Sequence, residues 1–85
     1  MKRTYLKAYN ALKKLGCPVF ERSDHPGRFL ISAEDPESYK WADYYAEFDG
    51  PWNGENTNPV MDKILRDCGL FAEWENPGCL VVCEI

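Results

Sequence analysis

The chain has 85 residues, of which 45% are hydrophobic and 28% charged, and its formal net charge is −4. This length allows one small hydrophobic core, so we expect a single globular domain over residues 1–85. The negative charge disfavours generic binding to a nucleic-acid backbone, and no apolar run approaches the ~20 residues that a membrane-spanning helix needs.

The chain begins with an amphipathic helix pattern over residues 2–15 rather than with a secretory signal, so we expect a cytoplasmic protein. Gly16 can adopt the left-handed conformation that ends a helix. Residues 1–34 hold seven Lys or Arg and three Asp or Glu. We interpret the cations of the helix as a solvated face, and the alternative is a contact for an acidic partner or nucleic acid; they are Lys2, Arg3, Lys7, Lys13 and Lys14. The predicted core stripe of this helix is Tyr5, Ala8, Tyr9, Leu12 and Leu15.

A hairpin is predicted next, with Pro26-Gly27 at the centre of a type II turn. Its register places Phe20, Phe29, Ile31 and Ala33 on one face of the sheet. His25 is the only histidine and lies in the turn beside Asp24. We interpret it as solvated, and the alternative is an enzyme or ligand-binding cleft near Asp24 and His25.

Residues 35–58 are the most acidic part of the chain, with one Lys or Arg and six Asp or Glu. Asp35-Pro36 is typical of a helix N-cap followed by proline in the first turn. We therefore predict a helix from residue 35 to about residue 48, stopped by Gly50-Pro51, and then a loop. Six of the twelve aromatic residues lie in this segment: Tyr39, Trp41, Tyr44, Tyr45, Phe48 and Trp52.

This aromatic cluster has two interpretations. Either the helix buries its aromatic stripe on the sheet, or part of the cluster stays exposed and docks on another protein, because Tyr and Trp are favoured at interface centres. On the second interpretation the residues that bind the partner are Tyr39, Trp41, Asp43, Tyr44, Tyr45, Glu47, Asp49, Trp52 and Glu55.

The last third repeats the plan of the first. A helix begins after Thr57 or Asn58 as cap, ends before Gly69 and leads into a hairpin that turns at Pro77-Gly78. With a two-residue type II loop, Ala72 faces Cys83 and Trp74 faces Val81. The predicted core face is then wholly apolar and consists of Leu70, Ala72, Trp74, Cys79, Val81, Cys83 and Ile85.

Four cysteines raise the question of a metal site or a disulfide. Cys79 and Cys83 are four residues apart on a predicted strand and hence ~13 Å apart, too far to share one zinc at ~2.3 Å from each sulfur. We expect free thiols, with a disulfide or a metal site as the alternatives. No metal and no cofactor are expected.

Together these patterns predict an α+β fold: a four-stranded antiparallel sheet from two hairpins, packed with about three helices in the order α-β-β-α-α-β-β. The preferred function is a non-enzymatic, intracellular protein-binding module, a small acidic inhibitor or adaptor. A more specific form is a phage-type inhibitor of a nucleic-acid-binding defence protein of the host. The alternatives are the small enzyme or ligand-binding domain and a structural homodimer.

Overall fold

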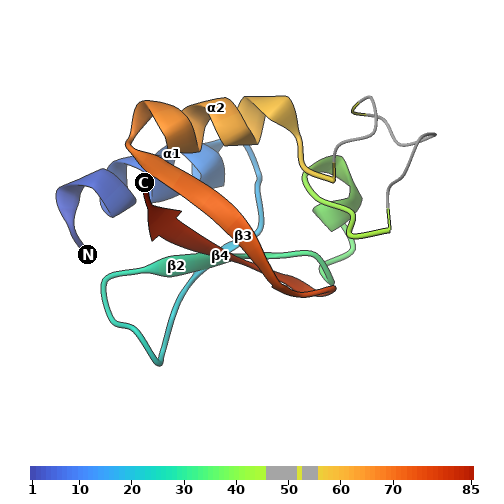
Figure 1. Cartoon of the computed structure of the whole chain (residues 1–85), viewed down its shortest axis with the longest axis horizontal. Helices are drawn as coiled ribbons and strands as arrows, with labels where there is room; N and C mark the ends of the chain where they lie inside the picture. The colour runs from blue at the N-terminus through green and yellow to red at the C-terminus, as the bar shows by residue number, and fades with distance from the viewer. Residues whose placement is uncertain (46–51, 53–55) are drawn as a thin grey trace.

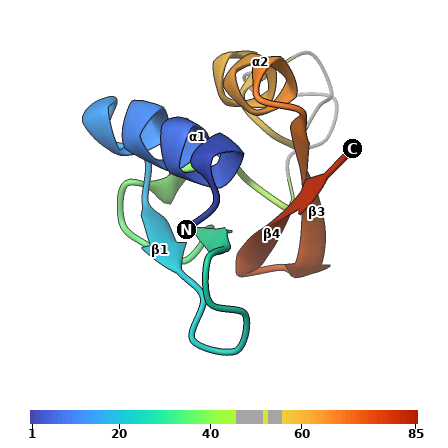
Figure 2. The same ribbon diagram turned by 90° about the vertical axis from the view of Figure 1, so that its left-hand side faces the viewer.

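The computed structural model describes residues 1–45, Trp52 and residues 56–85. The four strands of this part form one antiparallel sheet in the order β1-β2-β4-β3, and α1 and α2 lie over one face of it (Figure 1, Figure 2). The α+β fold with a four-stranded antiparallel sheet is confirmed. In chain order the elements are α1 (Arg3–Lys14), β1 (Val19–Glu21), β2 (Phe29–Ser32), the 3-10 turn η1 (Ser38–Lys40), α2 (Pro59–Asp67), β3 (Leu70–Asn76) and β4 (Cys79–Glu84).

The two halves of the sheet follow one plan. α1 and α2 are each followed by a glycine in the left-handed region, Gly16 at φ 88° and Gly69 at φ 76°, and each then leads into a hairpin. The second strands of the two hairpins, β2 and β4, pair at the centre of the sheet. Both predicted helix–glycine–hairpin units are therefore present, and β1 and β3 are left as the edge strands.

The core lies between the two helices and the sheet. Phe29 of β2 joins α1 to the sheet, because its ring meets those of Tyr5 and Tyr9 in perpendicular contacts with centroids 6.3 Å and 5.4 Å apart. Such edge-to-face pairs stabilise the fold beyond the contribution of the area that the rings bury. The largest fully buried side chains are Tyr5, Leu12, Phe29, Ile31, Ser38, Met61, Leu65, Leu70, Leu80 and Val82.

The predicted core stripe of α1 is buried or half-buried with one exception. Leu15 is 54% exposed, so its assignment to the core was wrong. The helix has ended by this point, and the backbone N–H of Cys17 donates to the carbonyl of Leu12 at 3.0 Å as Gly16 turns the chain. Cys17 is buried in place of Leu15. The rest of the stripe is buried or half-buried: Tyr5, Ala8, Tyr9 and Leu12.

The β3–β4 pairing contains a β-bulge that the sequence did not predict. Trp74 lies opposite Leu80, whereas Asn76 lies opposite Cys79. Two steps along β3 thus correspond to one step along β4, and Glu75 is the extra residue. The predicted register, with Trp74 opposite Val81, was wrong by one residue.

Because of the bulge, β4 turns toward the core the set of side chains that was predicted to face away from it. A shift of one residue moves every side chain of a strand to the other face of the sheet. Leu80 and Val82 are fully buried, and β3 still places Leu70 in the core as predicted. The residues predicted for the core face beyond the loop lie elsewhere: Cys79, Val81 and Cys83 are only half-buried, and Ile85 is 78% exposed.

The two Pro-Gly turns differ in backbone conformation. Gly27 has φ 90°, as a type II turn requires at its third position, but φ of Gly78 lies outside the left-handed region. The side-chain oxygen of Asn76 instead accepts a hydrogen bond from the backbone N–H of Gly78 at 2.9 Å. The type II prediction for Pro77-Gly78 was therefore wrong.

The first hairpin also turns the other face of its first strand inward. Val19 pairs with Ile31 and Glu21 with Phe29, so Val19, rather than Phe20, belongs to the core face. Val19 is buried and Phe20 is 49% exposed. The prediction for Phe20 was wrong, whereas those for Phe29 and Ile31 are confirmed.

The helix predicted from residue 35 to about residue 48 is absent from the described residues. The side chain of Asp35 does accept a hydrogen bond from the N–H of Glu37 at 3.1 Å, but only the three residues of η1 follow as helix. Ala42 then forms an antiparallel bridge with Thr57, and such extended pairing ends helical bonding. Residues 1–45 and 56–85 thus contain two α-helices rather than about three. Residues 46–48 of the predicted helix lie outside the described part.

Candidate protein-docking surface

The segment after β2 is tied to the core at several points. The buried hydroxyl of Ser38 donates to the carbonyl of Ser32 at 2.7 Å. The carbonyl of Trp41 accepts from the N–H of Asn58 at 2.8 Å, and the Asn58 side-chain amide donates to the carbonyl of Lys40 at 3.0 Å. The same Asn58 caps α2 by accepting from Val60 N–H. The chain before α2 therefore holds this segment in place.

Three tyrosines of this segment reach solvent. Tyr45 is 75% exposed, Tyr39 64% and Tyr44 44%. Trp41, which the sequence placed beside them in the candidate surface, is only 9% exposed and packs with the core. The segment thus buries one aromatic residue, Trp41, and exposes the rings of its three tyrosines.

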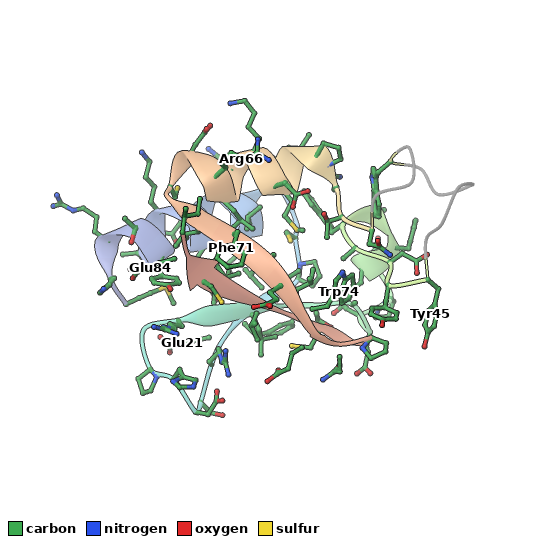
Figure 3. All side chains as sticks on the ribbon, viewed as in Figure 1. Glu21, Tyr45, Arg66, Phe71, Trp74 and Glu84 are labelled. Atoms are coloured by element: carbon green, nitrogen blue, oxygen red, sulfur yellow. The ribbon has the colours of Figure 1, made fainter. Side chains whose placement is uncertain are left out.

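A chain of perpendicular ring contacts supports two of these tyrosines. The Tyr44 ring lies 5.3 Å from that of Tyr45 and 5.2 Å from that of Trp74 on β3, measured between centroids. Figure 3 shows Trp74 and Tyr45 at the same end of the molecule. Trp74 is itself half-buried against the core, so the exposed rings are backed by the sheet.

Hydrogen bonds within and across the segment fix the backbone that carries these rings. An Asp43 carboxylate oxygen accepts from the N–H of Tyr45 at 3.0 Å. The side-chain amide of Asn56 donates to the carbonyls of Asp43 at 3.2 Å and Tyr44 at 2.7 Å, while Asp43 N–H donates to the Asn56 carbonyl at 2.9 Å. The turn is therefore held by the Asp43 side chain within it and by Asn56 across from it.

The charge of this surface is acidic among the residues that the structure describes. The one cation beside the tyrosines, Lys40, is paired with Glu37 at 2.7 Å and lies 5.8 Å from the centre of the Tyr39 ring. Asp43 is exposed and adds a negative charge. We call Tyr39, Asp43, Tyr44 and Tyr45 the tyrosine surface. Of the other predicted residues Trp52 is half-buried, and Glu47, Asp49 and Glu55 lie outside the described residues.

Asp24 and His25, the candidates for an enzyme or ligand cleft, lie on an exposed turn. Arg22 binds the Asp24 carboxylate through two hydrogen bonds of 3.0 Å and 2.7 Å, and this partner lowers the pKa of Asp24 to about 2. His25 Nε2 lies 3.9 Å from the same carboxylate, and the two side chains are 55% and 63% exposed. The arrangement gives Asp24 a structural partner. A cleft beside the same turn is lined by Pro26, Gly27 and Arg28 and by neither Asp24 nor His25.

The four cysteines are free thiols. Cys17 is buried, and this burial raises the pKa of its thiol to about 12. A raised pKa keeps a cysteine in the unreactive thiol form at neutral pH. Cys68, Cys79 and Cys83 are half-buried.

Two surface features were missed by the sequence analysis. Trp74 was assigned to the core, and its second role as support for Tyr44 depends on a contact between distant parts of the chain. Phe20 and Phe71 are 49% and 43% exposed and lie on the sheet face away from the helices. Their alternation with buried neighbours is a usable signal only once the register is known.

Comparisons with models of protein families, with curated proteins and with solved structures found no match to this chain. Within residues 1–45 and 56–85 no helix has both the length and the apolar composition to cross a bilayer.

Proposed function

We propose that this chain is a non-enzymatic protein-binding module that docks through the tyrosine surface. The observation that carries the proposal is the exposure of Tyr45 on a turn whose backbone and neighbouring ring are both held in place. Tyrosine offers a large contact area with few rotatable bonds, so a fixed, exposed tyrosine loses little conformational entropy on binding. Rings backed by Trp74 meet this condition.

The partner that suits this surface is basic. The net charge is −4, and residues 35–58 alone contribute six acidic residues against one lysine. Opposite charge accelerates encounter and selects the partner, and the effect weakens with added salt. A surface that normally binds nucleic acid has this chemistry, and occupying it would make the chain an inhibitor. The narrower proposal of a phage-type inhibitor of a host defence protein rests on small size and acidic charge.

A capture experiment with matched variants tests the proposal. The chain is immobilised and exposed to a lysate of the organism that encodes it, together with Tyr45→Ala and Asp43→Asn. Asp43→Asn keeps an oxygen for the hydrogen bond from Tyr45 and removes only the charge. Leu6→Ala on α1 and Glu73→Gln on β3 are the matched controls, because both residues are exposed and lie outside the tyrosine surface.

The expected result is a basic protein that both controls retain and Tyr45→Ala loses. Its affinity, remeasured with the purified partner, should fall with Asp43→Asn and with rising salt. Truncation of a hot-spot residue, the role proposed for Tyr45, costs about 2 kcal/mol or more, which is roughly thirty-fold in affinity. If the same proteins bind all five chains equally, the tyrosine surface is not the docking site.

A homodimer is the second candidate, and the sheet face opposite the helices favours it. The register aligns Phe20, Leu30 and Val81 in one row across β1, β2 and β4. The row ends at Glu73 on β3, and Phe71, two residues before it, adds a second aromatic ring to the same face. A second copy could bury this face against its own. Light scattering at increasing concentration tests this, with Phe20→Ser expected to shift the mass from dimer to monomer. A monomer at all concentrations excludes it.

A further inference from the structure

A cleft lies between the start of α1, the turn of the first hairpin and the end of β4. Its volume is about 370 Å³, near the lower end of the roughly 300 to 1,000 Å³ of small-molecule sites. Figure 3 shows Glu84, which lines it, at the opposite end of the molecule from Tyr45. The cleft is therefore separate from the tyrosine surface. Its lining consists of Met1, Lys2, Tyr5, Pro26, Gly27, Arg28 and Glu84.

Tyr5 contributes a buried hydroxyl without a partner to this cleft. The residue is 1% exposed, and its oxygen forms no hydrogen bond within the described part of the protein. Nearly all buried polar groups in proteins have a partner, so this exception indicates a missing acceptor or donor. Burial raises the pKa of Tyr5, so the hydroxyl keeps its proton and can donate. Tyr5 is also one of the residues that line the cleft.

Arg28 brings an unneutralised positive charge to the same place. Its guanidinium carbon lies 6.0 Å from the centre of the Tyr5 ring, and it forms no ion pair with any residue that the structure describes. Lys2 and Glu84 form an exposed ion pair of 3.0 Å at the rim and cancel each other's charge. Arg28 therefore adds to the cleft a positive charge that no ion pair among the described residues neutralises.

The backbone of the turn closes this side of the cleft. Gly27 has φ 90°, and a Cβ atom placed there would lie 3.6 Å from the Cα of Met1. The turn and the chain before α1 thus approach each other closely. This approach keeps Arg28 of the turn near Tyr5 of the helix.

We propose that the cleft binds a small carboxylate, held by the Arg28 guanidinium and the Tyr5 hydroxyl. Guanidinium matches the two oxygens of a carboxylate with two parallel hydrogen bonds, and the hydroxyl supplies a further donor. The positive charge of Arg28 attracts the negative charge of the ligand. A phosphate dianion would bring a second negative charge close to Glu84, so the carboxylate is the better ligand.

An NMR titration of the full chain tests this proposal. Backbone amide shifts are followed as sodium acetate is added, with sodium chloride at equal ionic strength and sodium phosphate as comparisons. Saturable shifts are expected with acetate at Tyr5, Gly27 and Arg28. Phosphate should bind more weakly and chloride should not saturate.

Variants of the cleft residues show whether acetate binds at a specific site or only by nonspecific contact. Arg28→Gln should weaken acetate binding by about ten-fold or more, as expected for a hydrogen bond to a charged group. Tyr5→Phe retains the ring and should weaken binding by a smaller factor of about three to ten. Arg66→Gln on α2 removes a charge elsewhere and should leave the affinity unchanged.

Two results would overturn the proposal. Linear acetate shifts that are equal in wild type and Arg28→Gln would mean that water alone satisfies the hydroxyl. Tighter binding of phosphate than of acetate would exclude a site built for a monovalent carboxylate.

Discussion

The register of β4 makes a quantitative prediction that two adjacent valines can test. Val82 is fully buried and Val81 half-buried on the opposite face of the same strand. Val82→Ala removes two buried carbon groups at ~0.8 kcal/mol each and leaves a cavity, so we expect a cost of about 2 to 3 kcal/mol. Val81→Ala loses the same atoms from a partly solvated face and should cost less than about 1 kcal/mol.

Urea unfolding followed by tryptophan fluorescence measures both variants. The difference of at least ~1 kcal/mol should also appear as a gap in Tm of at least roughly 4 to 8 °C for a domain of this size. Because both variants replace valine by alanine in one strand, the loss of β-propensity is largely common to them.

The bulge at Glu75 is what this comparison tests. Without the bulge, Val81 would face the core and Val82 would face solvent, and the order of the two stabilities would reverse. Equal costs, or a larger cost for Val81→Ala, would refute the register in which Trp74 lies opposite Leu80.

Three further predictions concern single residues. Asn58→Ala should lower the free energy of unfolding by about 1 to 2 kcal/mol through loss of the α2 cap, and Asn58→Asp should recover part of this in urea titrations. Asp24→Asn should lower the urea midpoint at pH 7 and have a much smaller effect at pH 2. Arg22 depresses the pKa of Asp24 to about 2, below its unfolded value, so the stabilisation is present above about pH 4 and is lost as the pH falls through 2. Equal midpoints at pH 7 would contradict this. Cys17 should be alkylated by iodoacetamide at pH 8 more slowly than Cys68, as followed by mass spectrometry, because burial raises the pKa of Cys17 to about 12. Equal rates would show that Cys17 is not protected.

The features that sequence predicted correctly are those set by neighbouring residues. A glycine after an amphipathic run ended both helices, and Asn58-Pro59 began α2. In each case the backbone geometry depends on a residue type that few others can replace. The four strands followed from turn residues between apolar runs for the same reason.

Which face of each strand is buried was harder to predict from the sequence, because it depends on pairing between distant residues. Both faces of β4 are apolar: Leu80 and Val82 alternate with Val81 and Cys83. The pattern alone therefore fits either orientation, and the choice falls to one extra residue in β3. Phe20 and Val19 presented the same ambiguity in β1. The wrong assignments thus share one physical cause.

The central segment shows how contacts between distant residues also create the candidate site. In a continuous helix Trp41 and Tyr45, four residues apart, would lie on one stripe and be buried or exposed together. The hydrogen bond between Trp41 and Asn58 and the bridge between Ala42 and Thr57 replace that helix. They turn Trp41 inward and leave Tyr45 75% exposed. The exposure of Tyr45 therefore follows from the same bonds that bury Trp41, so it is built into the fold and does not result from an excess of aromatic residues.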